Sequence, residues 1–291
     1  MGVQAGNLIF GNGSDEIIEI ICRTFLAPGN RVIYANCTFV EYEIITQVSG
    51  AKGICVPLKD FTYDLPAMAQ AVTSDTKIIF IANPNNPTGT MVTASEFRQF
   101  MARLPESVLV VVDEAYYEFV QRQDYPRSLD YLEQGRPIII LRTFSKIYGL
   151  AGLRIGYGIA DPEIITHLNK ARQPFNVNSL AQVAALAALD DEEYVKHTLD
   201  IIQQGRQYLY EQFNRLDLTF IPSEANFILF DAGLDGRKVY KTLLNQGVII
   251  RPMDIYGLTT HLRVTIGAAE ENRRFIASLE QALAQLTERA E

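Results

Sequence analysis

Short apolar runs alternate with helix-like segments through the first two-thirds of the chain, and this alternation limits the possible folds more than any other feature. Several runs are apolar almost throughout, as expected of strands that helices cover on both faces of a sheet. The alternation predicts an α/β fold, with a mainly parallel mixed sheet in a three-layer α/β/α arrangement and right-handed crossovers. The expected strands lie at residues 31–35, 53–57, 77–82, 107–112, 137–141 and 154–160. The expected helices lie at residues 39–48, 65–72 and 93–104.

The pattern changes after about residue 190, where a long amphipathic helix is expected over residues 192–216. Shorter elements follow it, and together they predict a small α+β domain. We therefore expect two domains, residues 1–190 and residues 191–291, which the long helix joins. The expected strands of the second domain lie at residues 226–231, 248–251 and 261–266, and its helices at residues 237–245 and 270–286.

Composition and charge narrow the class of protein. The net charge of −8 argues against a nucleic-acid groove or an anionic membrane surface as the main partner. No apolar stretch approaches the length of a membrane span, and no signal peptide opens the chain. The three cysteines lack the spacing of metal ligands and the three histidines are isolated, so no metal site is expected. A cytoplasmic enzyme that acts on small molecules fits these features.

Polar side chains follow several of the expected strands at the ends where those strands finish. Asn86 and Asp113 come after two neighbouring runs, and Tyr116 lies three residues beyond Asp113. Lys146 and Arg154 follow the run that ends at residue 141. Ligands of open α/β sheets bind at the carboxyl ends of the strands, and a lysine amine held there can condense with a carbonyl compound. These segments together predict a site for pyridoxal 5'-phosphate.

Each of these residues has a role in pyridoxal chemistry. Asp113 can pair with the pyridine nitrogen and keep it protonated, which makes the ring an electron sink. Tyr116 and Asn86 can donate hydrogen bonds to the phenolate oxygen of the ring. Lys146 can bond covalently to the cofactor and, once substrate displaces it, can move a proton between two carbon atoms. Phe39 could stack on a face of the ring.

A second group of residues could hold the phosphate of the cofactor. Gly13, Ser14 and Asp15 lead into an apolar helix pattern, and a helix start presents backbone N–H groups and the positive end of its dipole. Ser145 and Arg154 would complete the phosphate site. We expect the Asp15 side chain to cap the helix while its own N–H faces the anion.

Each signal is weak when it is taken alone. A lone lysine is usually a solvated charge, and an Asn-Pro-Thr-Gly segment can be a plain tight turn. The glycines near Gly11 lack the third glycine of a dinucleotide fingerprint, and no Gly-Lys-Ser of a Walker motif follows them. The order of the segments and their strand contexts favour the pyridoxal interpretation.

The motifs also resemble a known family. Asn-Pro-Thr-Gly at residues 86–89, Asp-Glu-Ala-Tyr at 113–116, Ser145-Lys146 and Gly-Leu-Arg-Ile-Gly at 152–156 are similar to those of the fold-type I, aspartate-aminotransferase-like family of pyridoxal enzymes. The resemblance runs from residue 7 to the C-terminal helix and implies the large domain of a pyridoxal-dependent transferase with a small C-terminal domain. Members of the family usually begin several dozen residues earlier, so the chain is expected to lack the usual N-terminal segment.

Three further segments resemble the branch of this family that acts on L-histidinol phosphate; they lie at residues 173–178, 247–252 and 262–267. The resemblance implies transamination between L-histidinol phosphate with 2-oxoglutarate and imidazole-acetol phosphate with glutamate, by a homodimer. It also implies that Arg263 grips the carboxylate of glutamate or 2-oxoglutarate and that Arg251 helps to hold the substrate phosphate, since a guanidinium matches both anions. Asn178 could line the pocket, although an asparagine that caps a helix is nearly as well supported.

Other functions remain open at this stage. An aromatic aminotransferase or a phospho-amino-acid decarboxylase of the same fold would share the cofactor residues. A noncatalytic protein that binds pyridoxal phosphate is a third alternative, which the short N-terminus suggests. Intact Lys146, Asp113, Tyr116, Asn86 and Arg154 argue against a degenerate site.

Overall fold

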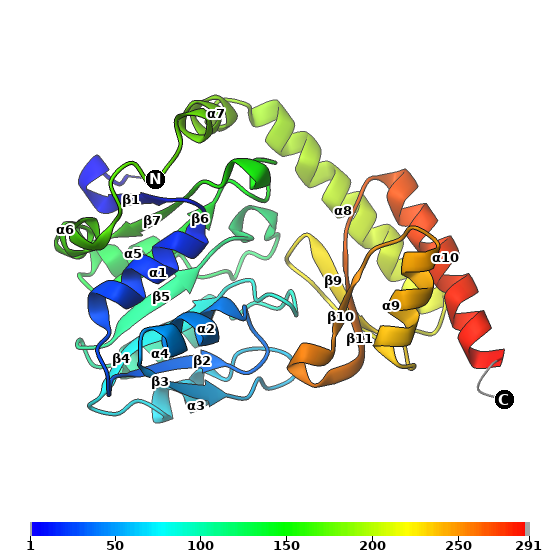
Figure 1. Cartoon of the computed structure of the whole chain (residues 1–291), viewed down its shortest axis with the longest axis horizontal. Helices are drawn as coiled ribbons and strands as arrows, with labels where there is room; N and C mark the ends of the chain where they lie inside the picture. Colours follow the sequence, from blue (N-terminus) through cyan, green and yellow to red (C-terminus); the bar gives the residue numbers. More distant parts are fainter. Residues whose placement is uncertain (1, 289–291) are drawn as a thin grey trace.

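A seven-stranded sheet forms the centre of the larger part of the molecule (Figure 1). The computed structural model describes residues 2–288. The strand order is β1-β7-β6-β5-β4-β2-β3, and the strands from β6 to β3 run parallel, whereas β7 is antiparallel to both of its neighbours. The expected mainly parallel mixed sheet is therefore confirmed. The strands are β1 (Leu8–Gly11), β2 (Arg31–Ala35), β3 (Lys52–Val56), β4 (Thr76–Ala82), β5 (Leu109–Asp113), β6 (Ile138–Thr143) and β7 (Gly156–Ala160).

Helices cover both faces of this sheet. Every residue of β5 and of β6 is buried, which requires cover on both sides of these central strands. The first helix, α1, contacts α2 and α6, whereas α3 contacts α4. The helices are α1 (Ser14–Phe25), α2 (Glu41–Val48), α3 (Leu65–Gln70), α4 (Ala94–Arg103), α5 (Ser128–Glu133), α6 (Pro162–Ala171) and α7 (Ser179–Leu189).

A smaller antiparallel sheet, in the order β10-β11-β9-β8, forms the second part of the molecule. Long helix α8 (Glu192–Arg215) runs from the first part to the second, and α8 and α9 both pack against α10 (Figure 1). A separate apolar core lies between these helices and the small sheet. The remaining elements are β8 (Phe220–Ile221), β9 (Phe227–Asp231), α9 (Gly236–Asn245), β10 (Arg251–Met253), β11 (Leu258–Thr265) and α10 (Ala269–Glu288).

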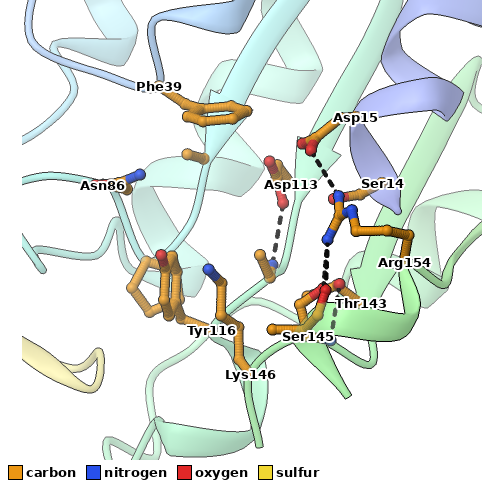
Figure 2. A pocket seen from close by; sticks show the side chains of 14 residues that line it. Ser14, Asp15, Phe39, Asn86, Asp113, Tyr116, Thr143, Ser145, Lys146 and Arg154 are labelled. Carbon is orange, nitrogen blue, oxygen red and sulfur yellow. Dashed lines mark hydrogen bonds and ion pairs between the residues drawn. The ribbon is translucent and has the colours of Figure 1, made fainter. Parts of the chain in front are cut away.

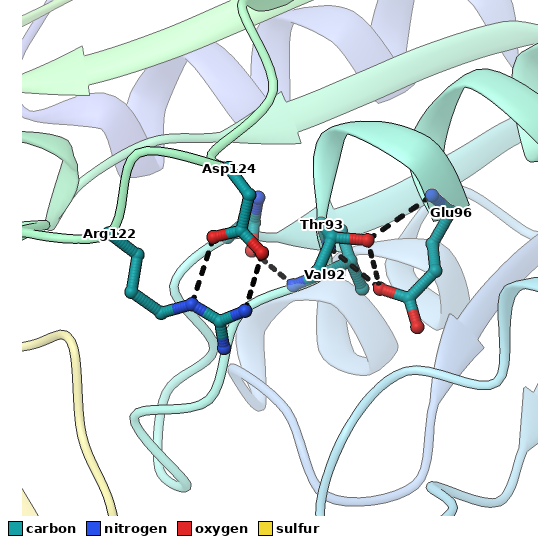
Figure 3. Close-up of polar contacts among 6 residues, drawn as sticks. Val92, Thr93, Glu96, Arg122 and Asp124 are labelled. Carbon is teal, nitrogen blue, oxygen red and sulfur yellow. Dashed lines mark hydrogen bonds and ion pairs between the residues drawn. The ribbon is translucent and has the colours of Figure 1, made fainter.

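Local polar contacts fix where helix α4 begins (Figure 3). The Thr93 hydroxyl accepts a hydrogen bond from the Glu96 amide, and a carboxylate oxygen of Glu96 accepts one from the Thr93 amide at 2.7 Å. This reciprocal capping satisfies N–H groups that the first turn leaves unpaired. The Ala94 amide donates to the carbonyl oxygen of Asp124, whose side chain pairs with Arg122. The start of α4 is thus anchored at the end of the loop that carries Asn86.

The structure differs from the expected elements at several points. The sequence pattern did not reveal β1, because this edge strand has only four residues and exposes Phe10. The expected strand at 154–160 begins at Gly156, since Arg154 has a left-handed backbone with φ of 56°. The expected strand at 248–251 is shifted to Arg251–Met253.

The pattern also missed α5, α6, α7 and β8. The division into residues 1–190 and 191–291 stays a prediction. Among residues 2–288, no helix is both long enough and apolar enough to cross a membrane.

Candidate active site

A cavity of about 260 Å³ opens where β4, β5 and β6 end, beside the start of α1 (Figure 2). Every candidate cofactor residue except Gly13 lines it, although these residues come from segments far apart in the chain. The lining also contains five residues that were not among the candidate site residues. The lining residues are Ser14, Asp15, Phe39, Ala82, Pro84, Asn86, Asp113, Ala115, Tyr116, Thr143, Ser145, Lys146, Ala151 and Arg154.

Asp113 is the last residue of β5, and its carboxylate is buried. The Ala115 amide donates to Oδ1 at 3.0 Å, and the Tyr42 hydroxyl donates to Oδ2 at 2.7 Å. Burial raises the pKa of Asp113 to about 6, while these two hydrogen bonds and the Lys146 amine oppose the rise. The site therefore holds a carboxylate that is largely ionised at neutral pH and has little contact with water.

Lys146 and Tyr116 lie together on the wall opposite Phe39 (Figure 2). The Lys146 Nζ atom is 5.3 Å from the centroid of the Tyr116 ring. Within the described part of the chain, no carboxylate pairs with this amine. Tyr116 is buried, and its ring meets the edge of Phe227 with 5.1 Å between centroids. The amine is thus held inside the cavity, where it can reach a small carbonyl compound.

Asn86 joins the cavity to the small sheet. Its Oδ1 atom accepts a hydrogen bond from Nη1 of Arg263, a residue of β11. This contact fixes which atoms of the amide face the cavity, and the Nδ2 atom points toward its centre (Figure 2). Asn86 can therefore donate to a ligand while Arg263 holds it in place.

The opposite end of the cavity collects groups that suit a phosphate. Ser14 is the first residue of α1, and Arg154 donates from Nη1 to the Ser145 hydroxyl at 3.3 Å. Gly13 does not line the cavity, but its φ of 84° is one that residues with a side chain rarely adopt, and a Cβ at this position would point at the Arg154 guanidinium. Glycine at position 13 thus lets Arg154 approach the positive end of the helix dipole.

Asp15 does not cap the helix as expected. Its Oδ2 atom accepts a hydrogen bond from Nη2 of Arg154 at 2.9 Å, and the N-cap position belongs to Gly13, which has no side chain. Arg154 attracts the carboxylate more strongly than a neutral amide does, because their interaction is charge-assisted. Asp15 therefore positions the arginine that a bound phosphate would meet.

The three candidate substrate residues lie outside the lining of this cavity. Arg251 and Arg263 are paired residues on β10 and β11, and both line a neighbouring cavity of about 630 Å³. Arg251 is exposed, whereas Arg263 is partly buried, and burial lowers the pKa of its guanidinium. Asn178 caps α7: its Oδ1 accepts from the Ala181 amide at 2.8 Å. The structure thus favours the capping interpretation of Asn178, and its role in substrate binding stays a prediction.

A buried ion pair lies behind the cavity, between the ends of β5 and β6. Glu114 accepts two hydrogen bonds from Arg142, at 3.0 and 2.8 Å, and one from the Ser128 hydroxyl at 2.6 Å. The pair connects the two strands that carry Asp113 and the Lys146 loop. It fixes the spacing of those two residues from the side that faces away from the ligand.

Two residues that make hydrogen bonds to candidate site residues were not themselves candidates. Thr143 lines the cavity, and its hydroxyl accepts from the Ser145 amide at 3.1 Å. Tyr42 lies behind the cavity and contacts Asp113. In the sequence, Tyr42 looks like any apolar residue on the buried face of a helix, so no local signal distinguishes it.

The residues present fit pyridoxal phosphate. The Asp113 carboxylate keeps lone pairs free beyond its two hydrogen bonds, and the Lys146 amine stands in the same cavity. Hydroxyls, an arginine and a helix start gather at one end, as a phosphate requires. Among the described residues, no group of three or more His, Cys, Asp or Glu side chains is placed to hold a metal ion.

Known proteins resemble this chain over nearly all of its length. The family model for aminotransferase class I and II matches residues 2–279. A histidinol-phosphate aminotransferase from Moorella thermoacetica is 52% identical over 285 residues, which cover 98% of this chain and 74% of that protein. Histidinol-phosphate aminotransferase 1 from Nitrosococcus oceani is 49% identical, over 97% of this chain and 76% of that protein.

Comparison with solved structures also finds a histidinol-phosphate aminotransferase among the similar proteins. The crystal structure of histidinol-phosphate aminotransferase from Sinorhizobium meliloti, in complex with pyridoxal-5'-phosphate, superposes with a TM-score of 0.92. It is 30% identical to this chain in sequence, and the match covers 98% of this chain and 78% of that one. The matched 98% of this chain extends over both the seven-stranded and the four-stranded sheet.

Proposed function

Since the chain belongs to the class I and II aminotransferase family, we propose that it transfers an amino group between glutamate and imidazole-acetol phosphate, giving 2-oxoglutarate and L-histidinol phosphate in histidine biosynthesis. The same residues serve the reverse direction. Pyridoxal 5'-phosphate is the cofactor. One observation carries the proposal: the 52% identity to the Moorella thermoacetica histidinol-phosphate aminotransferase extends over 98% of the chain.

Lys146 is the residue that acts directly on the reacting atoms. When bound, pyridoxal phosphate supplies a carbonyl that takes up the amino group and a ring that accommodates negative charge. The Lys146 amine is the group in the cavity that would bond to this carbonyl. When it is not bonded to the cofactor, Nζ would be free to remove a proton from the substrate carbon that bears the nitrogen and to deliver it to the cofactor's carbonyl carbon.

Three other side chains set the electronic properties of the site. The Asp113 carboxylate would hold the proton on the ring nitrogen, because a buried negative charge stabilises a facing positive one. The Tyr116 hydroxyl and the Asn86 amide lie on the opposite side of the cavity from Ser14 and Arg154, where they would donate to the ring oxygen (Figure 2). Phe39 would cover one face of the ring and exclude water from it.

The phosphate end orients the cofactor. Ser14, Ser145 and Arg154, with the backbone N–H groups at the start of α1, would bind the phosphate oxygens. Arg154 would exchange part of its contact with Asp15 for the more highly charged phosphate. This anchor would hold the cofactor in the cavity that Lys146 also lines.

Arg263 and Arg251 are the proposed substrate residues. Arg263 would grip the carboxylate of glutamate or 2-oxoglutarate, and its contact with Asn86 links that grip to the cofactor site. Arg251 would help to hold the substrate phosphate. The two guanidinium groups stand on neighbouring strands, and no acidic side chain of residues 2–288 forms an ion pair with either. Paired cations without a carboxylate partner favour an anionic ligand.

The test of the function is a direct assay. Purified protein is mixed with pyridoxal phosphate, L-histidinol phosphate and 2-oxoglutarate, and glutamate is measured, with Lys146→Ala as the inactive control. Glutamate is expected only with the unaltered protein. If the cofactor binds but no glutamate forms, the substrate assignment is wrong while the cofactor assignment stands. Carbon dioxide from threonine phosphate, or faster turnover of phenylalanine, would instead indicate one of the two related enzyme types.

We also propose that the protein works as a homodimer. The exposed face of α7 is apolar: Leu180, Val183 and Leu186 are 73%, 68% and 68% exposed, and Phe175 nearby is 98% exposed. Contiguous apolar surface of this kind marks an interface more often than a solvated surface. Leu186→Glu is expected to produce monomers in analytical ultracentrifugation, whereas Leu244→Glu on α9 leaves the dimer intact. Monomers in the unaltered protein would contradict the proposal.

The cytoplasm is the proposed location. Cys22, Cys37 and Cys55 are all free, and free thiols such as the exposed one of Cys55 persist in a reducing compartment. Cell fractionation with an antibody to the protein tests this location, and recovery of most of the protein outside the cytoplasmic fraction would contradict it.

A further inference from the structure

Tyr42 touches the catalytic carboxylate from outside the cavity. It lies in α2 and is fully buried, and it is not among the residues that line the cavity. Its hydroxyl nevertheless donates to Oδ2 of Asp113 at 2.7 Å, across 71 positions of sequence. The hydroxyl thus reaches Asp113 from the side that a ligand does not occupy.

Two aromatic contacts fix the position of this hydroxyl. The Tyr42 ring stacks on Phe80 of β4, with 4.6 Å between centroids and 1° between planes. Phe39, which lines the cavity, meets Tyr42 edge to face at 5.6 Å and 85°. Because β4 is hydrogen-bonded to β5, a ring clamped on Phe80 is held at a constant distance from Asp113. Tyr42 therefore contacts both Phe39, which lines one wall of the cavity, and the Asp113 carboxylate.

The electrostatic setting makes Tyr42 a permanent donor. Burial, together with the nearby Asp113 carboxylate, raises the pKa of Tyr42 well above its ordinary value, so the phenol stays protonated. A donor that faces a carboxylate favours its charged form. Asp113 also faces the Ala115 N–H, the Lys146 amine and the Asp15 carboxylate, and Tyr63 and Tyr116 lie close to Tyr42.

We propose that Tyr42 is a positioning residue for the reaction: its hydroxyl orients the Asp113 carboxylate and keeps it charged, so that Asp113 can hold the proton on the cofactor's ring nitrogen. The inference rests on the proposed function, because it assigns Tyr42 to the cofactor site. Tyr42 does not touch the reacting atoms, and the effect of its hydroxyl passes through Asp113.

The test compares Tyr42→Phe with the unaltered protein and two cofactors. The substitution removes the hydroxyl and keeps the ring that stacks on Phe80. The Kd of pyridoxal phosphate, measured by absorbance titration, is expected to rise about 10-fold, which is typical of a lost hydrogen bond to a charged group. With the analogue that carries C–H in place of the ring nitrogen, the two proteins are expected to bind equally, because Asp113 then has no proton to hold. The kcat should fall with little change in KM.

Tyr63→Phe is the matched control. Tyr63 is also buried, and the substitution removes the hydrogen bonds of its hydroxyl with Thr38 and with the Ala82 amide. Tyr63 makes no hydrogen bond to Asp113. Its variant should bind both cofactors as the unaltered protein does. If Tyr42→Phe raised the Kd of both cofactors equally, or changed neither Kd, the proposal would be overturned. Neither result would change the assignment of L-histidinol phosphate as the substrate, which the glutamate assay tests separately.

A second variant distinguishes loss of the hydroxyl from a folding defect in Tyr42→Phe. Tyr42→3-fluorotyrosine keeps the shape and the hydroxyl while it makes the phenol a stronger donor. Binding of pyridoxal phosphate should tighten and binding of the C–H analogue should stay the same. If the fluorinated protein binds both cofactors like the unaltered one, the hydroxyl has no positioning role.

Discussion

The cofactor end and the substrate end of the site differ in how firmly the fold holds them. Asp113 and Tyr116 are buried at the end of a central strand, and the Glu114–Arg142 pair ties that strand to its neighbour. Arg251, in contrast, is exposed on a three-residue strand of the small sheet. This difference indicates that the two sheets have different roles in the site. In the proposed function, the large sheet would hold the cofactor, while the small sheet would present the positive charges to the substrate.

Asn86 and Arg263 form the contact between these two regions. Arg263 is partly buried and touches the face of Phe227, with its Cζ 4.8 Å from the ring centroid, and Phe227 in turn meets Tyr116. A change in Arg263 can therefore reach the cofactor site, whereas a change in Arg251 should not. Substitutions at the two ends of the site test this difference.

Lys146→Ala should have the largest effect, because it removes the amine that we propose bonds to the cofactor and carries the proton. We expect glutamate formation to fall by about 10³-fold or more, within the range that a positioned acid–base group contributes. Borohydride reduction followed by peptide mapping should find no labelled peptide. Lys170→Ala, an exposed lysine of α6, is the control and should keep both the label and the activity. A label at another lysine in Lys146→Ala would show that the rigid end of the site has been assigned wrongly.

Asp113→Asn should lower kcat by about 10²-fold, because it removes a preorganised charge from a water-poor site. The same change should stabilise the cofactor-free protein. Burial raises the pKa of Asp113 from 3.8 to about 6, so the folded form holds the proton more tightly than the unfolded form does. The free energy of unfolding therefore falls as the pH rises from about 4 to about 6, by about 3 kcal/mol in all.

Urea unfolding of the cofactor-free proteins measures this effect. Asp113→Asn lacks the titrating carboxyl, so it should be the more stable protein at pH 8, and the difference should disappear below about pH 4. If Asp113→Asn and the wild-type protein were equally stable at every pH between 4 and 8, the buried carboxylate would have no energetic cost. In that case burial of the charged group would not distinguish the cofactor end of the site from the exposed Arg251.

Sequence alone predicted the rigid end much better than the other end. Asp113, Tyr116 and Lys146 follow strands in a parallel sheet, and the carboxyl ends of such strands meet by geometry. The small sheet offers no such rule, since the pairing of Arg251 with Arg263 depends on where short antiparallel strands align. Tyr42 was missed for another reason. Its role depends on a contact 71 positions away, and a local pattern cannot report that.

Arg263→Ala should weaken the binding of the amino acceptor, 2-oxoglutarate, and raise its KM by about 10²-fold, as the loss of a bidentate, charge-assisted contact predicts. Because Arg263 also orients Asn86, kcat should fall as well. Arg263→Lys keeps the charge but not the planar fork, so it should recover only part of the lost affinity. Steady-state kinetics with 2-oxoglutarate and L-histidinol phosphate separate the two effects. An altered KM with an unchanged kcat would mean that the contact with Asn86 does not couple the two regions.

Arg251→Ala should have the smallest and most selective effect. Its exposed guanidinium can give a phosphate only a solvent-screened contact, so we expect the KM for L-histidinol phosphate to rise by about 10-fold and that for glutamate to stay the same. Arg237→Ala is the matched control. Arg237 lines the same neighbouring cavity, but it is already paired with Asp254, and its loss removes an equal charge. If both variants weaken L-histidinol phosphate equally, and added salt abolishes the effect, the small sheet contributes a general positive field and not a specific phosphate contact.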